Sequence, residues 1–305
     1  MAKYILKKLL FMVPIIIGST IIIFSILHLS PGSPVDMIAG PNITPEVYEN
    51  IRRSLGLDKP LVTQYFIFFG KLLRGDLGTS ILQQRPVLDI VLERLPITLK
   101  LGFLSLLFSF SIAIPAGIIA AVKRNTAADY LSMSFSLLGI SMPTFWFGLI
   151  LLYFFAYKLG WFPTSGYQTW RHFVLPVATV GLTDAAVTAR MGRSSMLEVI
   201  RQDYIRTARA KGLRESIVIV KHAFKNALLP IITLFGMRIG WIFGGSAVME
   251  IVYSIPGIGR LMVDAIYARD YPIVQGSMLI LVICIMLGNL LADILYAWVD
   301  PRIKY

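Results

Sequence analysis

The segment from Asp203 to Pro230 is the part of this chain whose side chains are best suited to chemistry with another molecule. Lys and Arg dominate it, while alanines and aliphatic residues recur at helical spacing, so we expect short helices rather than a disordered basic tail. Basic side chains on a short helix would pair with carboxylates of a partner; the alternative is an ordinary charged loop that only fixes membrane topology. The residues at issue are Arg206, Thr207, Ala208, Arg209, Ala210, Lys211 and Gly212.

Motifs for catalysis are missing from the sequence. It contains no G-x-x-x-x-G-K-[ST] phosphate loop, no H-E-x-x-H zinc motif and no G-x-S-x-G nucleophile turn. The histidines are His28, His172 and His222, far apart in sequence, and Cys284 is the single cysteine. We therefore expect a non-catalytic chain that binds no metal or cofactor of its own.

The composition is that of a membrane protein. Hydrophobic residues make up 56% and charged residues 15% of the 305 residues, and the mean hydropathy is +0.71. A hydrocarbon layer of about 30 Å takes roughly 20 helical residues to cross, and a single strand would leave its backbone groups unpaired there. We therefore predict an all-α integral membrane protein with six transmembrane helices, at about Leu9–Leu29, Leu99–Val122, Leu131–Tyr157, Phe173–Ala189, Leu228–Met249 and Val274–Val299.

The distribution of charge predicts the orientation. With the N-terminus inside, segments 1–8, 123–130, 190–227 and 300–305 are cytoplasmic and carry 16 basic against 5 acidic residues. The remaining loops carry 11 basic against 10 acidic residues. The positive-inside rule then places both termini in the cytoplasm. The net charge of +12 reports topology, so no nucleic-acid partner is expected.

Three regions follow from this topology. Residues 1–29 form the cytoplasmic N-terminal end and the first span, which we interpret as retained rather than cleaved. Residues 30–98 form an external segment of about three short helices, one of them beginning at Thr44 and Pro45 and another covering Pro86–Leu95. Residues 99–305 form the transmembrane core, with the basic cytoplasmic loop at about 193–227.

Ionisable and small residues within the spans offer two further features. Asp184, Arg238 and Asp293 each cost on the order of 3 kcal/mol at mid-bilayer unless they face protein or water, so they either neutralise one another or line a solute path. A stripe of glycines on the fifth span, which lets another helix approach closely, packs either within the chain or against a second membrane subunit. Its members are Gly236, Gly240 and Gly244.

An ordered set of short motifs resembles the membrane permeases of binding-protein-dependent ABC importers, in the dipeptide, oligopeptide and nickel group. The resemblance runs nearly end to end. It rests on Leu29-Ser30-Pro31-Gly32-Ser33-Pro34, Leu55-Gly56-Leu57-Asp58, Gly75-Asp76-Leu77-Gly78, Ser141-Met142-Pro143-Thr144-Phe145-Trp146, Gly160-Trp161-Phe162-Pro163, Arg193-Ser194-Ser195-Met196-Leu197, Glu250, Tyr253, Pro256-Gly257-Ile258-Gly259 and Asp270-Tyr271-Pro272.

The basic loop resembles the family's "EAA" motif, with the triplet on Arg206-Thr207-Ala208 and the family's glycine at Gly212. Two triplet letters differ, and Phe224-Lys225 replace a later Leu-Pro, which we interpret as a mark of the peptide branch. The resemblance implies a type I importer permease whose loop is a coupling helix that docks on an ATPase subunit.

The resemblance also implies a location in the inner (plasma) membrane of a bacterial or archaeal cell, and it implies the partners and the cargo. The partners are a second, homologous permease, two ATP-binding subunits that hold ATP and Mg, and an extracytoplasmic solute-binding protein. Peptides are the expected cargo, with nickel chelates or glutathione as alternatives. Two other classes stay open from the sequence: a self-contained secondary carrier, and a membrane sensor or scaffold that recruits a cytosolic partner.

Overall fold

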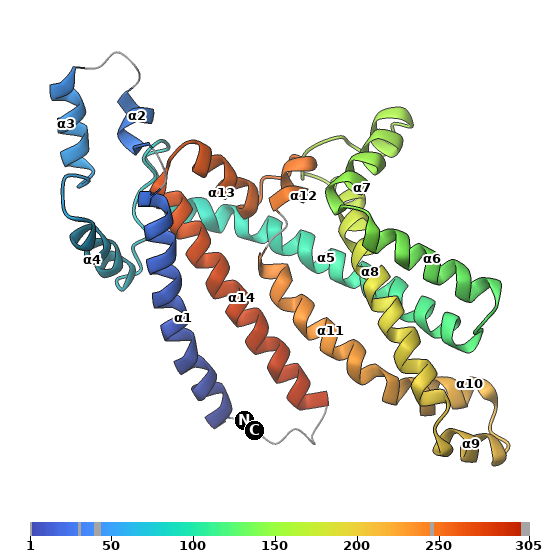
Figure 1. Ribbon diagram of the computed structural model, residues 1–305. Coiled ribbons are helices and arrows are strands. Elements are labelled where there is room, and N and C mark those ends of the chain that lie inside the picture. The colour runs from blue at the N-terminus through green and yellow to red at the C-terminus, as the bar shows by residue number, and fades with distance from the viewer. Residues whose placement is uncertain (1, 30–31, 40–43, 245–246, 300–305) are drawn as a thin grey trace. The chain divides into compact units, whose positions relative to one another are not determined.

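The computed structural model describes residues 2–29, 32–39, 44–244 and 247–299. Within these ranges no residue lies in an extended strand, and one isolated bridge joins Thr79 to Pro86. The all-α class predicted from the sequence is therefore confirmed (Figure 1). The helices are α1 Ala2–Leu29, α2 Pro34–Ala39, α3 Pro45–Ser54, α4 Leu61–Leu72, α5 Val87–Val122, α6 Ala127–Ser141, α7 Thr144–Leu151, α8 Arg171–Ile200, α9 Asp203–Ala210, α10 Glu215–Ile217, α11 Lys225–Gly244, α12 Ala247–Val252, α13 Ile258–Tyr267 and α14 Tyr271–Val299, with π-helical stretches η1 Leu152–Lys158 and η2 Val218–Phe224.

Five helices of the described ranges are long and apolar enough to cross a membrane, and a bent pair brings the number to six. The bent pair replaces the straight third span that we predicted over Leu131–Tyr157. Here α6 ends at Ser141, and α7 with η1 leaves it at 107°. The cause is Pro143, which lacks an N–H and forces Met142 before it into an extended conformation, with ψ at 132°.

The external segment also differs from the prediction in one respect. Pro86–Leu95 was expected to be a separate short helix, but its residues form the first turns of α5, which continues unbroken for 36 residues. A helix of this length is about 54 Å long, well beyond the thickness of the hydrocarbon layer. The expected helix start at Thr44 is present, because the Thr44 side chain accepts a hydrogen bond from the Val47 N–H and Pro45 opens α3.

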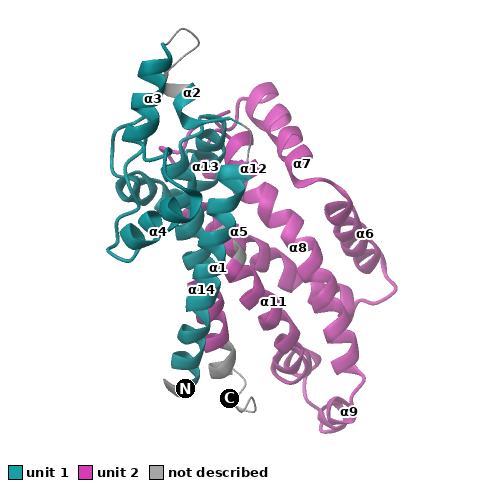
Figure 2. Cartoon of the chain, turned by 60° about the vertical axis from the view of Figure 1, so that its left-hand side comes forward, with its two compact units in different colours: residues 1–98, 244–247, 256–286 teal, residues 99–243, 248–255, 287–305 magenta. Residues whose placement is uncertain are grey.

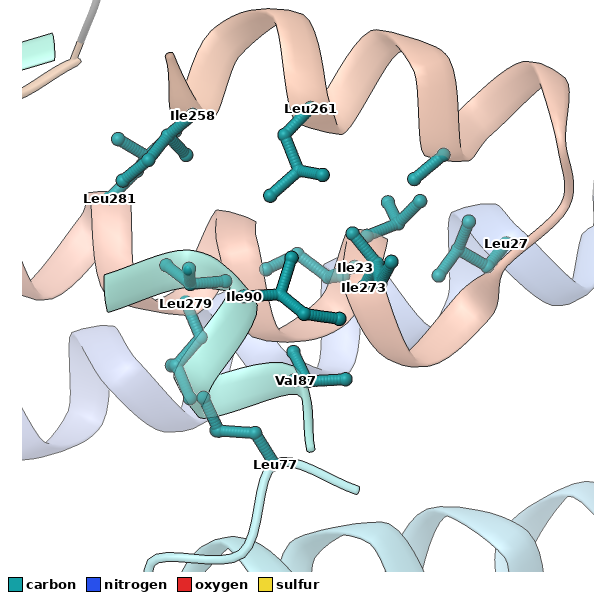
Figure 3. Close-up of a cluster of buried hydrophobic side chains, with 13 residues drawn as sticks. Ile23, Leu27, Leu77, Val87, Ile90, Ile258, Leu261, Ile273, Leu279 and Leu281 are labelled. Atoms are coloured by element: carbon teal, nitrogen blue, oxygen red, sulfur yellow. The ribbon is translucent and has the colours of Figure 1, made fainter. Parts of the chain in front are cut away.

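The chain forms two compact units, coloured separately in Figure 2. Unit 1 comprises residues 1–98, 244–247 and 256–286. Its core gathers aliphatic side chains of α1, α5, α13 and α14 (Figure 3). Close packing of these side chains holds the first turns of α5 against the surrounding helices. They include Ile23, Leu27, Val87, Ile90, Ile258, Leu261, Ile273 and Leu279.

Unit 2 comprises residues 99–243, 248–255 and 287–305. In it, α8 packs against α6 and α7. Both helices that flank the basic loop are longer than predicted. The fourth span was predicted to end at Ala189 but α8 continues to Ile200, and the fifth was predicted to begin at Leu228 but its helix begins at Glu215.

These extensions shorten the loop between the fourth and fifth spans to residues 201–214. The part of the basic segment after Glu215 is therefore not a separate short helix, as we expected, but the first turns of the fifth span. Two parts of the predicted topology, 245–246 within the fifth span and the C-terminal segment 300–305, lie outside the described residues.

Candidate coupling site

The short helix α9 stands between α8 and the helix that begins at Glu215. Gln202 precedes α9 in an extended conformation, and Asp203 places a carboxylate in its first turn, where the helix dipole favours negative charge. Gly212 follows α9 with φ at +75°, a backbone conformation that residues other than glycine rarely adopt. The backbone therefore turns sharply after one short helix.

One face of α9 is buried in its own unit. Ile205 is fully buried and Ala208 is 5% exposed. Both lie in an apolar cluster with Met196 of α8 and with Val218 and Ala223 of η2. Ile205 and Ala208 therefore anchor α9 to the ends of two membrane helices.

The opposite face of α9 is free for a partner. The Arg206 side chain is 76% exposed, and among the residues that the structure describes its one ion pair is a long contact of 3.6 Å with Asp203. Thr207 donates to the Asp203 carbonyl, and its neighbours on this face, Ala210 and Lys211, are exposed. Such a surface pair contributes little to stability, so the Arg206 guanidinium remains available to an acidic group.

Arg209 forms an ion pair within the chain, and its contact with an ATPase stays a prediction. Its Nε and Nη2 atoms donate to the carboxylate of Glu215, with Nη2 2.6 Å from Oε1. The hydrogen bond with Glu215 raises the pKa of Arg209 above its ordinary value. The pair ties the end of α9 to the start of α10 across Gly212. Sequence reasoning grouped Arg209 with the partner-facing residues and missed Glu215.

Two of the three intramembrane charges lie together. Arg238 of α11 and Asp184 of α8 form an ion pair of 3.0 Å, and each side chain is about a quarter exposed. The third, Asp293, lies on α14, and its role stays a prediction.

One member of the glycine stripe has a defined neighbour in its own chain. A Cβ atom on Gly240 would collide with Oδ1 of Asn289, on the part of α14 that belongs to unit 2. Gly240 therefore packs within the chain. For Gly236 and Gly244, contact with a second membrane subunit stays a prediction.

Two polar clusters of unit 2 were not predicted as contacts, although Arg193 and Tyr253 belong to the motifs that carry the family resemblance. Arg193 of α8 donates from Nε and Nη2 to Asp129 of α6, at 2.6 and 2.8 Å. Tyr253 donates to the Gly148 carbonyl at 3.0 Å, and its hydroxyl lies 2.7 Å from that of Thr179. Each joins residues more than 60 positions apart, and no local pattern marks such pairs.

No group of three or more His, Cys, Asp or Glu side chains suited to a metal ion occurs among the residues for which the structure gives positions.

The arrangement around α9 supports mechanical linkage, with an anchored helix, an exposed basic face and a fixed turn.

Comparison with known proteins identifies the family. Residues 113–305 match the binding-protein-dependent transport system inner membrane component family, and residues 1–102 match the N-terminal region of the same kind of component. The chain belongs to this family. It is a permease component of an ABC importer and an inner-membrane protein.

Named relatives match this permease along its whole length. The glutathione transport system permease protein GsiC of Escherichia coli strain K12 is 42% identical over 305 residues, covering 100% of both chains. GsiC of Shigella boydii serotype 4 is 41% identical over the same length. The sequence-based assignment to the importer permeases is therefore confirmed.

Solved structures share the fold of the permease. A chain of the MetNI methionine ABC transporter, in an inward-facing conformation, aligns with a TM-score of 0.58 at 22% identity, over 70% of this chain and 97% of that one. A chain of an amino acid ABC transporter aligns with a TM-score of 0.50 at 16% identity, over 70% and 94%. The type I importer permease architecture expected from the sequence is thus present.

Proposed function

We propose that the chain forms half of a transmembrane pathway for short peptides, with the tripeptide glutathione as the first candidate cargo. The observation that carries this proposal is the 42% identity, without a missing region, to a glutathione transport permease. Glutathione is a small peptide, so this cargo unites the sequence-based expectation of peptide transport with the named relative. Nickel chelates are the second candidate, carried over from the family resemblance alone.

Energy enters, on this proposal, through α9. Its exposed face, with Arg206, Thr207 and Lys211, docks on an ATPase subunit, where acidic groups pair with the basic side chains. The buried face, through Ile205 and Ala208, transmits the displacement to the ends of α8 and the fifth span. Rigid-body movement of packed helices is a common means of opening and closing such a pathway.

The proposed assembly contains a second homologous permease, two ATP-binding subunits that hold ATP and Mg, and an extracytoplasmic solute-binding protein. α9 and both termini then lie in the cytoplasm, as the excess of basic residues in segments 1–8 and 190–227 favours. The permease itself is non-catalytic in this assembly.

Uptake into proteoliposomes tests the proposal. The complete transporter would be reconstituted with its binding protein on the side of the membrane opposite α9. Labelled glutathione, a labelled dipeptide or a labelled nickel chelate would be added on that side, and ATP or a non-hydrolysable analogue on the α9 side. We expect ATP-dependent accumulation of glutathione or the dipeptide. Accumulation of the nickel chelate alone would overturn the cargo, and ATP-independent uptake by the permease alone would favour a secondary carrier.

A further inference from the structure

We propose that α5, α6 and α8 of unit 2 hold an anionic phospholipid, with its acyl chain in an apolar groove and its phosphate among arginines at the α9 end of α8. The site is separate from the coupling surface, and the inference does not depend on which solute is carried.

The tail of the lipid would occupy a groove of about 450 Å³ between these three helices. Its walls are almost entirely apolar, with Ala113 and Ala116 from α5, Gly139 from α6 and Ala186 from α8. Small residues at these positions leave the space open, while Phe135 at its rim is 73% exposed. A groove of this size and composition accommodates a hydrocarbon chain.

The head would occupy a hollow of about 480 Å³ lined by Arg124, Arg193 and Arg201. Arg193 is neutralised by Asp129 through Nε and Nη2. Glu198 also lines the hollow, so Arg124 and Arg201 leave it with one net positive charge. Within the described ranges neither of these two arginines forms an ion pair, and both are exposed. Guanidinium groups bind phosphate oxygens in paired, charge-assisted hydrogen bonds.

The two spaces follow one face of α8. Leu182, Ala186 and Ala189 line the groove, and Arg193 and Leu197 continue the same face into the hollow. Their spacing of three and four residues places them one above another. The Arg193–Asp129 pair, whose carboxylate is nearly buried, lies between the apolar and the charged parts.

This combination selects the occupant. A second membrane helix would cover the apolar groove but leave the arginines without a partner. Free phosphate, or an acidic side chain of a soluble subunit, would engage the arginines but leave the groove empty. A phospholipid has both an anionic head and an apolar tail, and basic pockets between membrane helices are known to bind such head groups.

Native mass spectrometry of the purified transporter, titrated with dioleoylphosphatidylglycerol, tests the head. Arg124→Gln combined with Arg201→Gln is expected to weaken lipid binding roughly tenfold. The control, Lys7→Gln combined with Lys221→Gln, removes the same charge from exposed positions elsewhere and is expected to change nothing. Equal binding by the two double variants would overturn the proposal, as would equal binding of dioleoylphosphatidylcholine.

The groove is tested by two substitutions on α6, of which one fills the groove and the other is the control. Ser132→Phe fills the end of the groove near Asp129 and is expected to lower lipid binding several-fold, whereas Ser134→Phe, at an exposed position that does not line the groove, is the control. If both variants bind lipid as the unmodified protein does, and inorganic phosphate displaces the lipid completely, the arginines are assigned to a soluble anion. Dissociation of the second permease by Ser132→Phe, with lipid binding unchanged, would assign the groove to that subunit.

Discussion

Arg209 and Glu215 lie on either side of Gly212 in the chain, and paired hydrogen bonds join the guanidinium of the one to the carboxylate of the other. The backbone reverses at Gly212, and the ion pair closes the two arms of the turn on each other. Since Ile205 and Ala208 fix α9 to the helices on its other side, α9 is held at two places. On the proposed coupling role, a displacement of α9 is therefore passed on to the membrane helices.

The Arg209–Glu215 pair is expected to matter more for coupling than for stability. Both side chains are about half exposed, so their interaction contributes at most about 1 kcal/mol. Arg209→Ala and Glu215→Ala should each lower ATP-driven uptake, and the double variant should lose no more than the worse single one. Uptake and ATP hydrolysis measured together test this. Strictly multiplicative losses would show that the two residues act separately.

Gly212 is expected to be required for its backbone conformation and not for space. A Cβ atom there would meet no atom within 4 Å, but φ is +75°. Gly212→Val should cost roughly 1–2 kcal/mol through strain in the left-handed region, while Asn tolerates this conformation. We therefore expect Gly212→Val to uncouple ATP hydrolysis from uptake and Gly212→Asn to retain most uptake. Equal loss in both variants would point to a contact with the partner instead.

The sequence predicted the class of fold, five of the spans and the short helix before Gly212, because hydropathy, charge and turn residues are local signals. It did not predict where helices continue beyond the apolar stretch. α8 reaches Ile200 and the fifth span begins at Glu215 because Met196 and Val218 pack around α9, a tertiary effect. Likewise, Arg209 was recognised as basic, but only folding shows that its partner is Glu215.

The cost of replacing a tightly packed glycine by alanine is expected to depend on the atoms that the new Cβ atom would contact. A Cβ on Gly117 of α5 would lie 2.8 Å from the Ala189 carbonyl oxygen, which is backbone, whereas a Cβ on Gly240 meets the movable end of the Asn289 side chain. Gly117→Ala should therefore destabilise by about 1–3 kcal/mol, and Gly240→Ala by much less. Thermal unfolding of the purified transporter tests the contrast. A larger loss for Gly240→Ala would contradict it and would favour a tight contact with another subunit at that position.

The Asp184–Arg238 pair separates a structural role from a role in the solute path. Asp184→Asn leaves Arg238 partly buried without its partner, so it should lower the melting temperature by several degrees. Asp184→Asn combined with Arg238→Met removes both charges and should restore most of that loss. If the pair is structural, uptake returns together with stability. A stable double variant with abolished uptake would show that these charges contact the solute.

Tyr253 provides a pH-dependent stability that can be assigned to one side chain. Burial raises its pKa to about 12, and Tyr253 lies outside the helices that qualify as membrane spans. Above pH 10 the unfolded chain loses the hydroxyl proton while the folded chain keeps it, so stability is fully present below about pH 10 and is lost as the pH rises through about 12.

The size of the effect follows from the shift. Two pKa units correspond to about 2.7 kcal/mol, which is the expected loss of unfolding free energy attributable to Tyr253 across this range. Tyr253→Phe should cost about 1–2 kcal/mol at neutral pH, because the Gly148 carbonyl loses its donor. The variant should then lose less stability than the unmodified protein between pH 10 and 12, as measured by thermal unfolding. Parallel curves for the two proteins over that range would show that the Tyr253 proton makes no such contribution.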